Sequence, residues 1–286
     1  MNRFFAVLVL TLLALVPASQ ASAQLLAAKD GPIVYGHHHL NTTNVDAQKK
    51  FFVDTLGGTV VKIGTREIVR FPNVLIFFNP TAPTAGTRGS TVNHIGFSVP
   101  DLRPVIDKIK ANGFQMITRS EVAATVEVKD DIALNSPTTS IAFALAPDDV
   151  KVELVQVKTQ TIPITLHHVH FFGQQNTEMR DWYVKVFGAK PRDGAAFVSG
   201  DLPGLALNFT KSPDPTVGTQ GRALDHIGFE VKNLEEFTKK LEAMGIKLER
   251  PYTKVAALNI AVAFIKDPWG TYIELTEGLD KVADSQ

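Results

Sequence analysis

The chain has 286 residues, with 29 basic and 29 acidic side chains and therefore a formal net charge near zero. A balanced charge gives no broad basic surface, so we expect no nucleic-acid partner. The sequence contains no cysteine, which excludes disulfides, thiolate metal ligands and cysteine nucleophiles. The fold must therefore rest on its packed core, and any chemistry must come from other side chains.

The N-terminus has the pattern of a secretory signal peptide. An arginine near the start precedes an apolar run from Phe4 to Val16, and the small residues Ala21-Ser22-Ala23 follow. The apolar run is too short to span a membrane comfortably. We therefore predict a signal peptide at residues 1–23. The mature protein is expected to be secreted or periplasmic, without membrane attachment after cleavage.

The rest of the chain is a duplication, which is visible in three pairs of segments. "VNHIGFSVPDL" from Val92 matches "LDHIGFEVKNL" from Leu224. "HHHLNTTNVDAQKKFFVDTLGG" aligns without a gap with "HVHFFGQQNTEMRDWYVKVFGA", and "PDDVKVELVQ" with "PWGTYIELTE". The repeat predicts a first domain at 24–160, a second at 161–279 and a C-terminal tail at 280–286.

Each copy is itself doubled, because it contains two strand-and-helix units. Helices are expected over 44–56, 101–112, 176–187 and 233–244, since each begins at Asn or Asp and is followed by glycine. Asn233 and Glu236 have the spacing of a capping box. Strand-like runs such as "NVLIFF" and "IAVAFI" fill the remainder. The order predicts an α+β fold of four βαβββ modules.

Strand alternation sorts the histidines of the unusual run "GHHHLN". His37 and His39 must share one face of a strand, while His38 points to the other. In the second copy His168 and His170 share a face in the same way. The repeat aligns His37 with His168 and His39 with His170. The two histidines left over, His38 and His167, are predicted to be surface residues.

Two further positions repeat between the copies. His94 and His226 lie in the two His-Ile-Gly-Phe strands, and Glu153 and Glu274 lie inside apolar final strands, where a carboxylate is costly unless it is paired or binds a metal. Two imidazoles and one carboxylate suit a divalent ion with open coordination positions. We predict the ligand sets His37, His94 and Glu153, and His168, His226 and Glu274. His39 and His170 are expected to support these ligands or to line the cavity.

With these motifs, and with "DPWGTYIELTE" from Asp267, the chain resembles the vicinal oxygen chelate superfamily. That superfamily includes glyoxalase I, extradiol dioxygenases, and fosfomycin- and bleomycin-resistance proteins. The resemblance covers nearly all of the chain after the signal peptide. It implies two glyoxalase-like domains with cupped mixed sheets, each built around one metal. It also implies that the six residues of the two predicted sets are the ligands.

The sequence departs from two of these relatives. Phe264 and Phe143 stand where extradiol dioxygenases carry a tyrosine, which disfavours standard ring cleavage. Glyoxalase I has an acidic ligand near the end of a third strand. At that position this chain has Phe78 or Asn79 in the first copy and Asn208 or Phe209 in the second, none of which is acidic. Family membership alone does not fix a reaction.

We therefore expect a protein that binds a divalent metal (Fe, Mn, Zn or Ni) and acts as a lyase, isomerase or oxygenase on a small oxygen-chelating substrate. A homodimer is compatible with this expectation. One alternative is a non-catalytic protein that sequesters a small molecule, of the bleomycin-resistance type. Another is a purely structural role for the six residues. Further polar strand residues are read as exposed rather than as substrate contacts: Arg66, Arg70, Asn79, Asn208 and Lys211. Trp182 and Tyr183 are expected to pack in the core.

Overall fold

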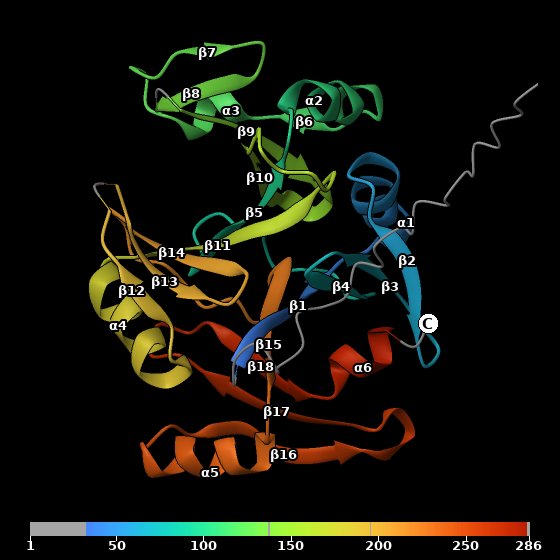
Figure 1. The fold of residues 1–286 in the computed structure, drawn as a ribbon, viewed down its shortest axis with the longest axis vertical. Helices are drawn as coiled ribbons and strands as arrows, with labels where there is room; N and C mark the ends of the chain where they lie inside the picture. Colours follow the sequence, from blue (N-terminus) through green and yellow to red (C-terminus); the bar gives the residue numbers. More distant parts are fainter. Residues whose placement is uncertain (1–32, 137, 195, 285–286) are drawn as a thin grey trace, which may run out of the picture.

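The computed structural model describes residues 33–136, 138–194 and 196–284 (Figure 1). The predicted signal peptide lies outside the described residues. Among the helices that are described, none is long and apolar enough to cross a membrane. The fold consists of two large mixed sheets with helices packed against them, so the predicted fold class is confirmed.

The first sheet has eight strands in the order β16-β17-β18-β15-β1-β4-β3-β2. Its strands are β1 (Ile33–Asn41), β2 (Thr59–Ile63), β3 (Arg66–Phe71), β4 (Val74–Asn79), β15 (Leu224–Val231), β16 (Leu248–Val255), β17 (Ile260–Lys266) and β18 (Tyr272–Glu277). This sheet therefore joins the first and the fourth of the predicted modules, which belong to different copies.

The second sheet has ten strands. Nine follow the order β12-β13-β14-β11-β5-β10-β9-β8-β7, and β6 pairs with β9. Its strands are β5 (Val92–Val99), β6 (Gln115–Met116), β7 (Val128–Lys129), β8 (Ile132–Ser136), β9 (Thr139–Ala146), β10 (Val150–Gln156), β11 (Thr165–Gly173), β12 (Lys190–Arg192), β13 (Val198–Leu202) and β14 (Leu205–Lys211). It joins the second and the third modules. The predicted domain limit at 160/161 falls in the connection between β10 and β11, and the limits themselves stay a prediction.

All four predicted helices are present. They are α1 (Val45–Lys49), which continues as the π-helical turn η1 (Lys50–Thr55), α2 (Leu102–Ala111), α4 (Asn176–Phe187) and α5 (Leu234–Ala243). The structure adds the short helices α3 (Thr118–Glu121) and α6 (Leu279–Asp284), and the 3-10 turns η2 (Pro147–Asp149) and η3 (Ala256–Leu258). The glycines predicted to end the four long helices have φ between 71° and 86°, which L side chains rarely adopt: Gly57, Gly113, Gly188 and Gly245.

The predicted capping box at the start of α5 is wrong. Asn233 has a left-handed backbone (φ 59°) and its side chain makes no capping hydrogen bond. The Leu234 N–H instead donates to Glu277 Oε2 of β18, at 2.9 Å. The free N–H group at the start of the helix is therefore satisfied by a residue far away in sequence, whereas the local pattern predicted a partner within the same helix turn.

We expect Glu277→Ala to lower the free energy of unfolding by about 1 kcal/mol, the usual cost of losing a helix cap. Glu236→Ala, at the position of the absent capping box, should leave stability unchanged. Urea denaturation of both variants measures this difference. Equal losses in the two variants would contradict the assignment.

The main core lies between the sheets and unites both copies. Phe71 of β3 and Phe97 of β5 meet with ring centroids 4.8 Å apart. His38 faces this core, fully buried, with Nδ1 2.6 Å from the Tyr35 hydroxyl. Its prediction as a surface residue is wrong because both faces of β1 are covered. Tyr183 is buried and Trp182 packs against the same core, as predicted.

A buried carboxylate ties the start of α6 to the first sheet. Glu230 of β15 accepts hydrogen bonds from the Thr276 hydroxyl at 2.6 Å, and from the Gly278 and Leu279 N–H groups. Burial, together with the nearby Asp280 carboxyl, raises the pKa of Glu230 from 4.5 to about 8. The folded chain therefore keeps a proton that the unfolded chain releases at lower pH.

This pKa predicts that the protein loses stability as the pH rises. The contribution of Glu230 is fully present below pH 4.5 and is lost as the pH rises toward about 8. The slope in that window is at most about 1.4 kcal/mol per pH unit. Chemical denaturation at pH 5, 6.5 and 8 should show a shallower decline for Glu230→Gln than for the wild type. Parallel declines would mean that Glu230 does not titrate in this range.

Candidate metal centres

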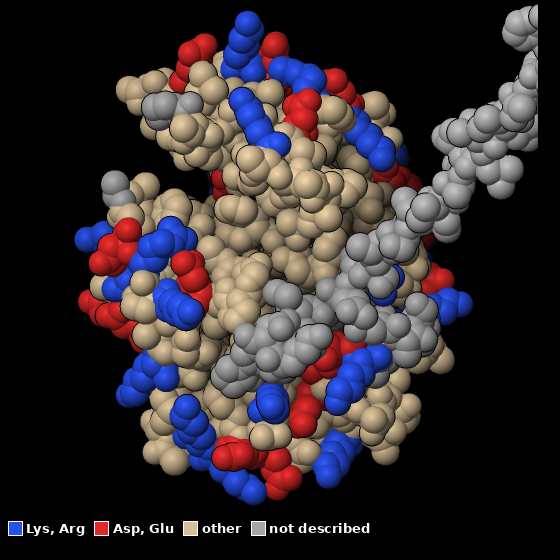
Figure 2. All heavy atoms as spheres, viewed as in Figure 1, with Lys and Arg blue, Asp and Glu red and all other residues tan. Residues whose placement is uncertain are grey.

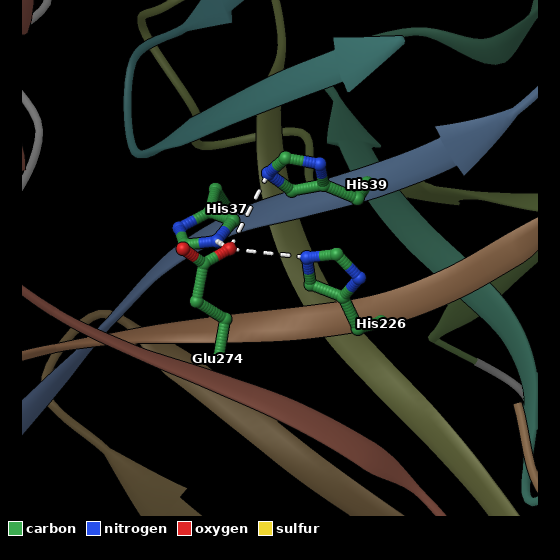
Figure 3. Close-up of side chains that lie close together, drawn as sticks. All are labelled: His37, His39, His226 and Glu274. Carbon is green, nitrogen blue, oxygen red and sulfur yellow. Dashed lines mark hydrogen bonds and ion pairs between the residues drawn. The ribbon is translucent and has the colours of Figure 1, made fainter. Parts of the chain in front are cut away.

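Three histidines converge on one carboxylate in the first sheet (Figure 3). The Nε2 atoms of His37, His39 and His226 lie 3.0, 3.4 and 3.0 Å from Glu274 Oε2. A register shift between Tyr35 and His37 in β1 changes the alternation of its side chains, so that His37 and His39 face away from the main core. These four residues form the small-cavity cluster, and one ligand atom from each lies within 4.8 Å of all the others.

The second sheet holds an equivalent group. Nε2 of His94 and of His168 lie 2.8 and 3.1 Å from Glu153 Oε2. His170 completes this large-cavity cluster, again with ligand atoms within 4.8 Å of one another. His170 Nε2 also lies 2.8 Å from the Thr210 hydroxyl.

All six predicted ligands belong to these clusters, but the predicted sets are wrong. His37 of the first copy lies with His226 and Glu274 of the second. His168 of the second copy lies with the first copy's His94 and Glu153. The cause is the sheet pairing, because β1 runs beside β15 and β11 runs beside β5. His39 and His170 are members of the clusters, so each centre offers three imidazoles and one carboxylate.

Hydrogen bonds show which ring nitrogen of each His-Ile-Gly-Phe histidine carries the proton when the ring is neutral. His226 Nδ1 lies 2.6 Å from Asp225 Oδ1, and His94 Nδ1 lies 2.9 Å from Asn93 Oδ1. Both oxygens are acceptors, so each Nδ1 carries a proton and donates it. When the ring is neutral, its Nε2 lone pair therefore lies on the side of the carboxylate and is available to a metal ion. A divalent cation between the two acceptors satisfies both, so the donor sets fit such an ion.

The two centres differ in their electrostatics. Burial lowers the pKa of His94 to about 4, so this imidazole is neutral near pH 7. Burial also disfavours the charged form of His226, but hydrogen bonds to Asp225 and Glu274 outweigh it and raise the pKa of His226. Burial raises the pKa of both cluster carboxylates, but the facing histidines outweigh it when they are protonated and donate, and they hold both pKa values well below the usual range.

The glycine of each His-Ile-Gly-Phe strand makes room for a histidine ring of the cluster. A Cβ on Gly228 would lie 2.0 Å from His37 Cε1, and one on Gly96 would lie 2.1 Å from His168 Cε1. Real Cβ atoms are essentially never found that close to another atom, so only glycine fits beneath each ring. The motif is therefore part of both candidate centres and not only a strand signal.

The cavities around the two clusters differ in size. The small cavity has a volume near 260 Å³ and its apolar lining includes Phe77, Leu258 and Leu279. The Phe77 ring stacks on His39, with centroids 4.5 Å apart. The large cavity has a volume near 600 Å³, and its lining includes Val126, just before β7, and Phe197, just before β13. The surface is visibly hollowed between the β7–β8 and β12–β13 regions in Figure 2.

No acidic side chain occupies the strand positions where glyoxalase I would require one. Phe77, rather than Phe78 or Asn79, faces the small cavity, and Phe78 lies in the main core. Asn208 lines the large cavity and its Oδ1 accepts from the Ser199 hydroxyl at 2.8 Å. The prediction of Asn208 as an exposed residue is therefore wrong, since it is buried.

The two phenylalanines expected in place of a tyrosine lie beside ligand rings. Phe143 is 5.5 Å from His94 and Phe264 is 5.5 Å from His226, measured between ring centroids. Neither offers a hydroxyl to a substrate. His167 is half-buried and lines the large cavity, with Nδ1 2.9 Å from His168 Nδ1, so its prediction as a surface residue is also wrong.

Three charged residues of the large cavity were not predicted as site residues: Arg88, Glu121 and Lys151. For Lys151 a sequence signal existed. It lies two residues before Glu153 in an apolar strand, and so must share the face of that ligand. Arg88 and Glu121 carry no comparable signal, because the fold alone brings the loop before β5 and helix α3 to the cavity.

The sequence matches the family model described as the Glyoxalase/Bleomycin resistance protein/Dioxygenase superfamily, over residues 34–131 and 165–275. Glyoxalase I from Zea mays has a similar fold, with a TM-score of 0.68 and 16% identity over 90% of this chain and 96% of that one. A Bacillus subtilis protein whose assignment as a dioxygenase is itself provisional gives a TM-score of 0.65 and 11% identity, over 88% and 90% of the two chains. No curated protein matches the chain in sequence.

Proposed function

Because the chain belongs to the Glyoxalase/Bleomycin resistance protein/Dioxygenase superfamily, we propose that it is a divalent-metal enzyme that acts on a small oxygen-chelating molecule. Its working centre is the large-cavity cluster. The observation that carries this proposal is the convergence of three imidazoles and a carboxylate in an open cavity near 600 Å³. Lyase, isomerase and oxygenase reactions are all compatible with such a ligand set.

When bound, a divalent ion supplies a Lewis acid that polarises neighbouring substrate oxygens. His94, His168 and Glu153 would hold it, and His170 would be the fourth ligand in place of the acidic one used by glyoxalase I. Asn93 keeps the His94 ring in the ligating tautomer through their 2.9 Å hydrogen bond. The donor set is compatible with Fe, Mn, Zn or Ni.

The surrounding side chains suit a substrate that is partly apolar. Phe143 and Phe172 line the cavity and keep water from one side of the cluster, while the Asn208 amide and the Thr210 hydroxyl can orient polar groups. The small-cavity cluster would also hold a metal, but Phe77 and Leu279 leave little room for a substrate. The sequence favours the second copy as the site of activity because its final segment is more regular. The sizes of the cavities instead favour the centre that contains Glu153 as the working one.

We propose in addition that the protein is exported, on the N-terminal signal pattern alone, and that it can form a homodimer. Its substrate would then be a molecule available outside the cytoplasm. The competing function is sequestration of an apolar ligand without turnover.

Metal analysis of the untagged mature protein tests this function. The protein is stripped, reloaded separately with Fe, Mn, Zn and Ni, and assayed against vicinal diols and dicarbonyl compounds. We expect close to two metal equivalents per chain and turnover with at least one metal. Failure of every metal to bind would remove the enzyme hypothesis. Tight binding of an unaltered small molecule would favour sequestration.

A further inference from the structure

We infer that the large cavity accepts an anionic small molecule whose carboxylate binds to the ammonium group of Lys151. This inference names a substrate class and rests on the proposed function only for the oxygen-chelating end of the ligand. It follows from the burial of Lys151, its contacts and its place relative to the large-cavity cluster.

Lys151 is almost completely buried, with 3% of its surface exposed. Its Nζ donates to Glu121 Oε2 at 2.7 Å and lies 5.6 and 5.7 Å from the ring centroids of Phe143 and Phe172. An ammonium group is rarely buried without partners, because it loses its hydration. Nζ has three N–H donors and Glu121 takes one, which leaves donors for a ligand.

Glu121 does not neutralise this site by itself, because it is shared. Its other oxygen, Oε1, accepts from Arg88 Nη2 at 2.6 Å. Two cations therefore face one carboxylate at this end of the cavity. The arrangement also holds the lysine in place, since Glu121 is fixed from both sides. Glu153 is the second carboxylate that acts on Lys151. A divalent ion bound by Glu153 would use that charge, and an anionic group of a ligand beside Lys151 and Arg88 would then balance it.

The ammonium group and the cluster line the same cavity. Lys151 and Glu153 lie on one face of β10, with backbones about 6.6 Å apart at the usual rise of a strand. The Phe143 and Phe172 rings that flank Lys151 also approach the His94 ring, with centroids 5.5 and 6.4 Å away. A fitting ligand thus has an anionic group at one end, a short flat apolar body, and oxygens at the other end.

The other copy shows that this lysine is not required by the fold. In the repeat, the final strands β10 and β18 align Glu153 with Glu274, which places Tyr272 at the position of Lys151. The equivalent strand therefore forms with a neutral side chain there. Among the described residues that line the two cavities, a lysine is found in the large cavity and not in the small one.

A pair of ligands that differ only in charge tests the inference. Calorimetry would compare 3,4-dihydroxybenzoate with 3,4-dihydroxybenzamide, on protein loaded with zinc. We expect the acid to bind roughly tenfold to a hundredfold more tightly than the amide, as for a charge-assisted hydrogen bond. Lys151→Met should abolish this preference and Lys151→Arg should retain most of it. Lys211→Met, which removes an exposed lysine of β14, should leave the preference unchanged.

Because Lys151→Met leaves Glu121 with one partner fewer, Glu121→Gln/Lys151→Met serves as a second variant without the uncompensated carboxylate. The inference is overturned by a wild type that does not prefer the acid or binds neither compound. It is also overturned by a preference that survives in both lysine-free variants, since the carboxylate would then lie elsewhere. Metal content measured on the same samples separates the two hypotheses. A Lys151-dependent preference in a protein that retains no metal would refute the proposed function and support the anion site.

Discussion

Replacing His168 with alanine is expected to remove one of two metal equivalents and to abolish turnover. His37→Ala is expected to remove the other equivalent and to leave turnover largely intact. His168 belongs to the large-cavity cluster, whereas His37 belongs to the small-cavity cluster, whose cavity of about 260 Å³ is lined by Phe77 and Leu279. Loss of a direct ligand should lower kcat/KM at least as much as loss of a group behind a ligand, which typically costs up to about a hundredfold.

The same experiment distinguishes the two ways of pairing the copies. Glu153→Gln should behave like His168→Ala, although the two residues belong to different copies. Glu274→Gln should in the same way behave like His37→Ala. Metal content by mass spectrometry and steady-state kinetics on all four variants measure this. If His168→Ala instead removes the same equivalent as Glu274→Gln, the cross-copy assignment is wrong.

The second large effect is expected at the two glycines beneath the ligand rings. Gly96→Ala should displace the His168 ring, and Gly228→Ala should displace the His37 ring, because each added Cβ would lie about 2 Å from ring atoms. Each variant should lose one metal equivalent, and overpacking should lower stability by about 1–3 kcal/mol. Gly96→Ala alone should also abolish turnover.

Gly36→Ala is the matched control for these variants. Gly36 lies on the neighbouring strand β1, and the nearest atom to an added Cβ is the Glu230 backbone nitrogen at 3.4 Å. The control should keep both metal equivalents. Melting curves and metal analysis of the three proteins are sufficient. Full metal occupancy in Gly228→Ala would mean that the His37 ring can move aside without leaving its centre.

The local sequence was enough to predict the modules and the faces of their strands. Helix caps and glycine stops located the four long helices, and alternation placed His37 and His39 on one face, opposite His38. The local sequence could not predict which strands pair with each other in the sheets. Strands β5 and β15 share the His-Ile-Gly-Phe pattern, so nothing local tells β1 which of them is its neighbour.

The local sequence pattern also could not predict which side chains are buried or which distant residues they contact. His38 resembles a surface residue until the fold covers both faces of β1 and buries its side chain completely. Asn233 and Glu236 have capping spacing, yet the partner of the helix end comes from β18. The contact between Glu121 and Lys151 joins helix α3 to strand β10 across 30 residues of chain. Each of these outcomes depends on tertiary contacts that no short window contains.

Cross-copy sheet pairing has a consequence for how the duplicated chain can diverge. Each copy contributes side chains to both clusters, so neither cluster is encoded by one continuous half of the gene. A half chain produced alone could rebuild a centre only by associating with a second half. Mutations that disrupt one whole copy would therefore damage both centres and could not inactivate just one of them. The two centres can specialise through the other side chains that line their cavities, as Lys151 of the large cavity illustrates.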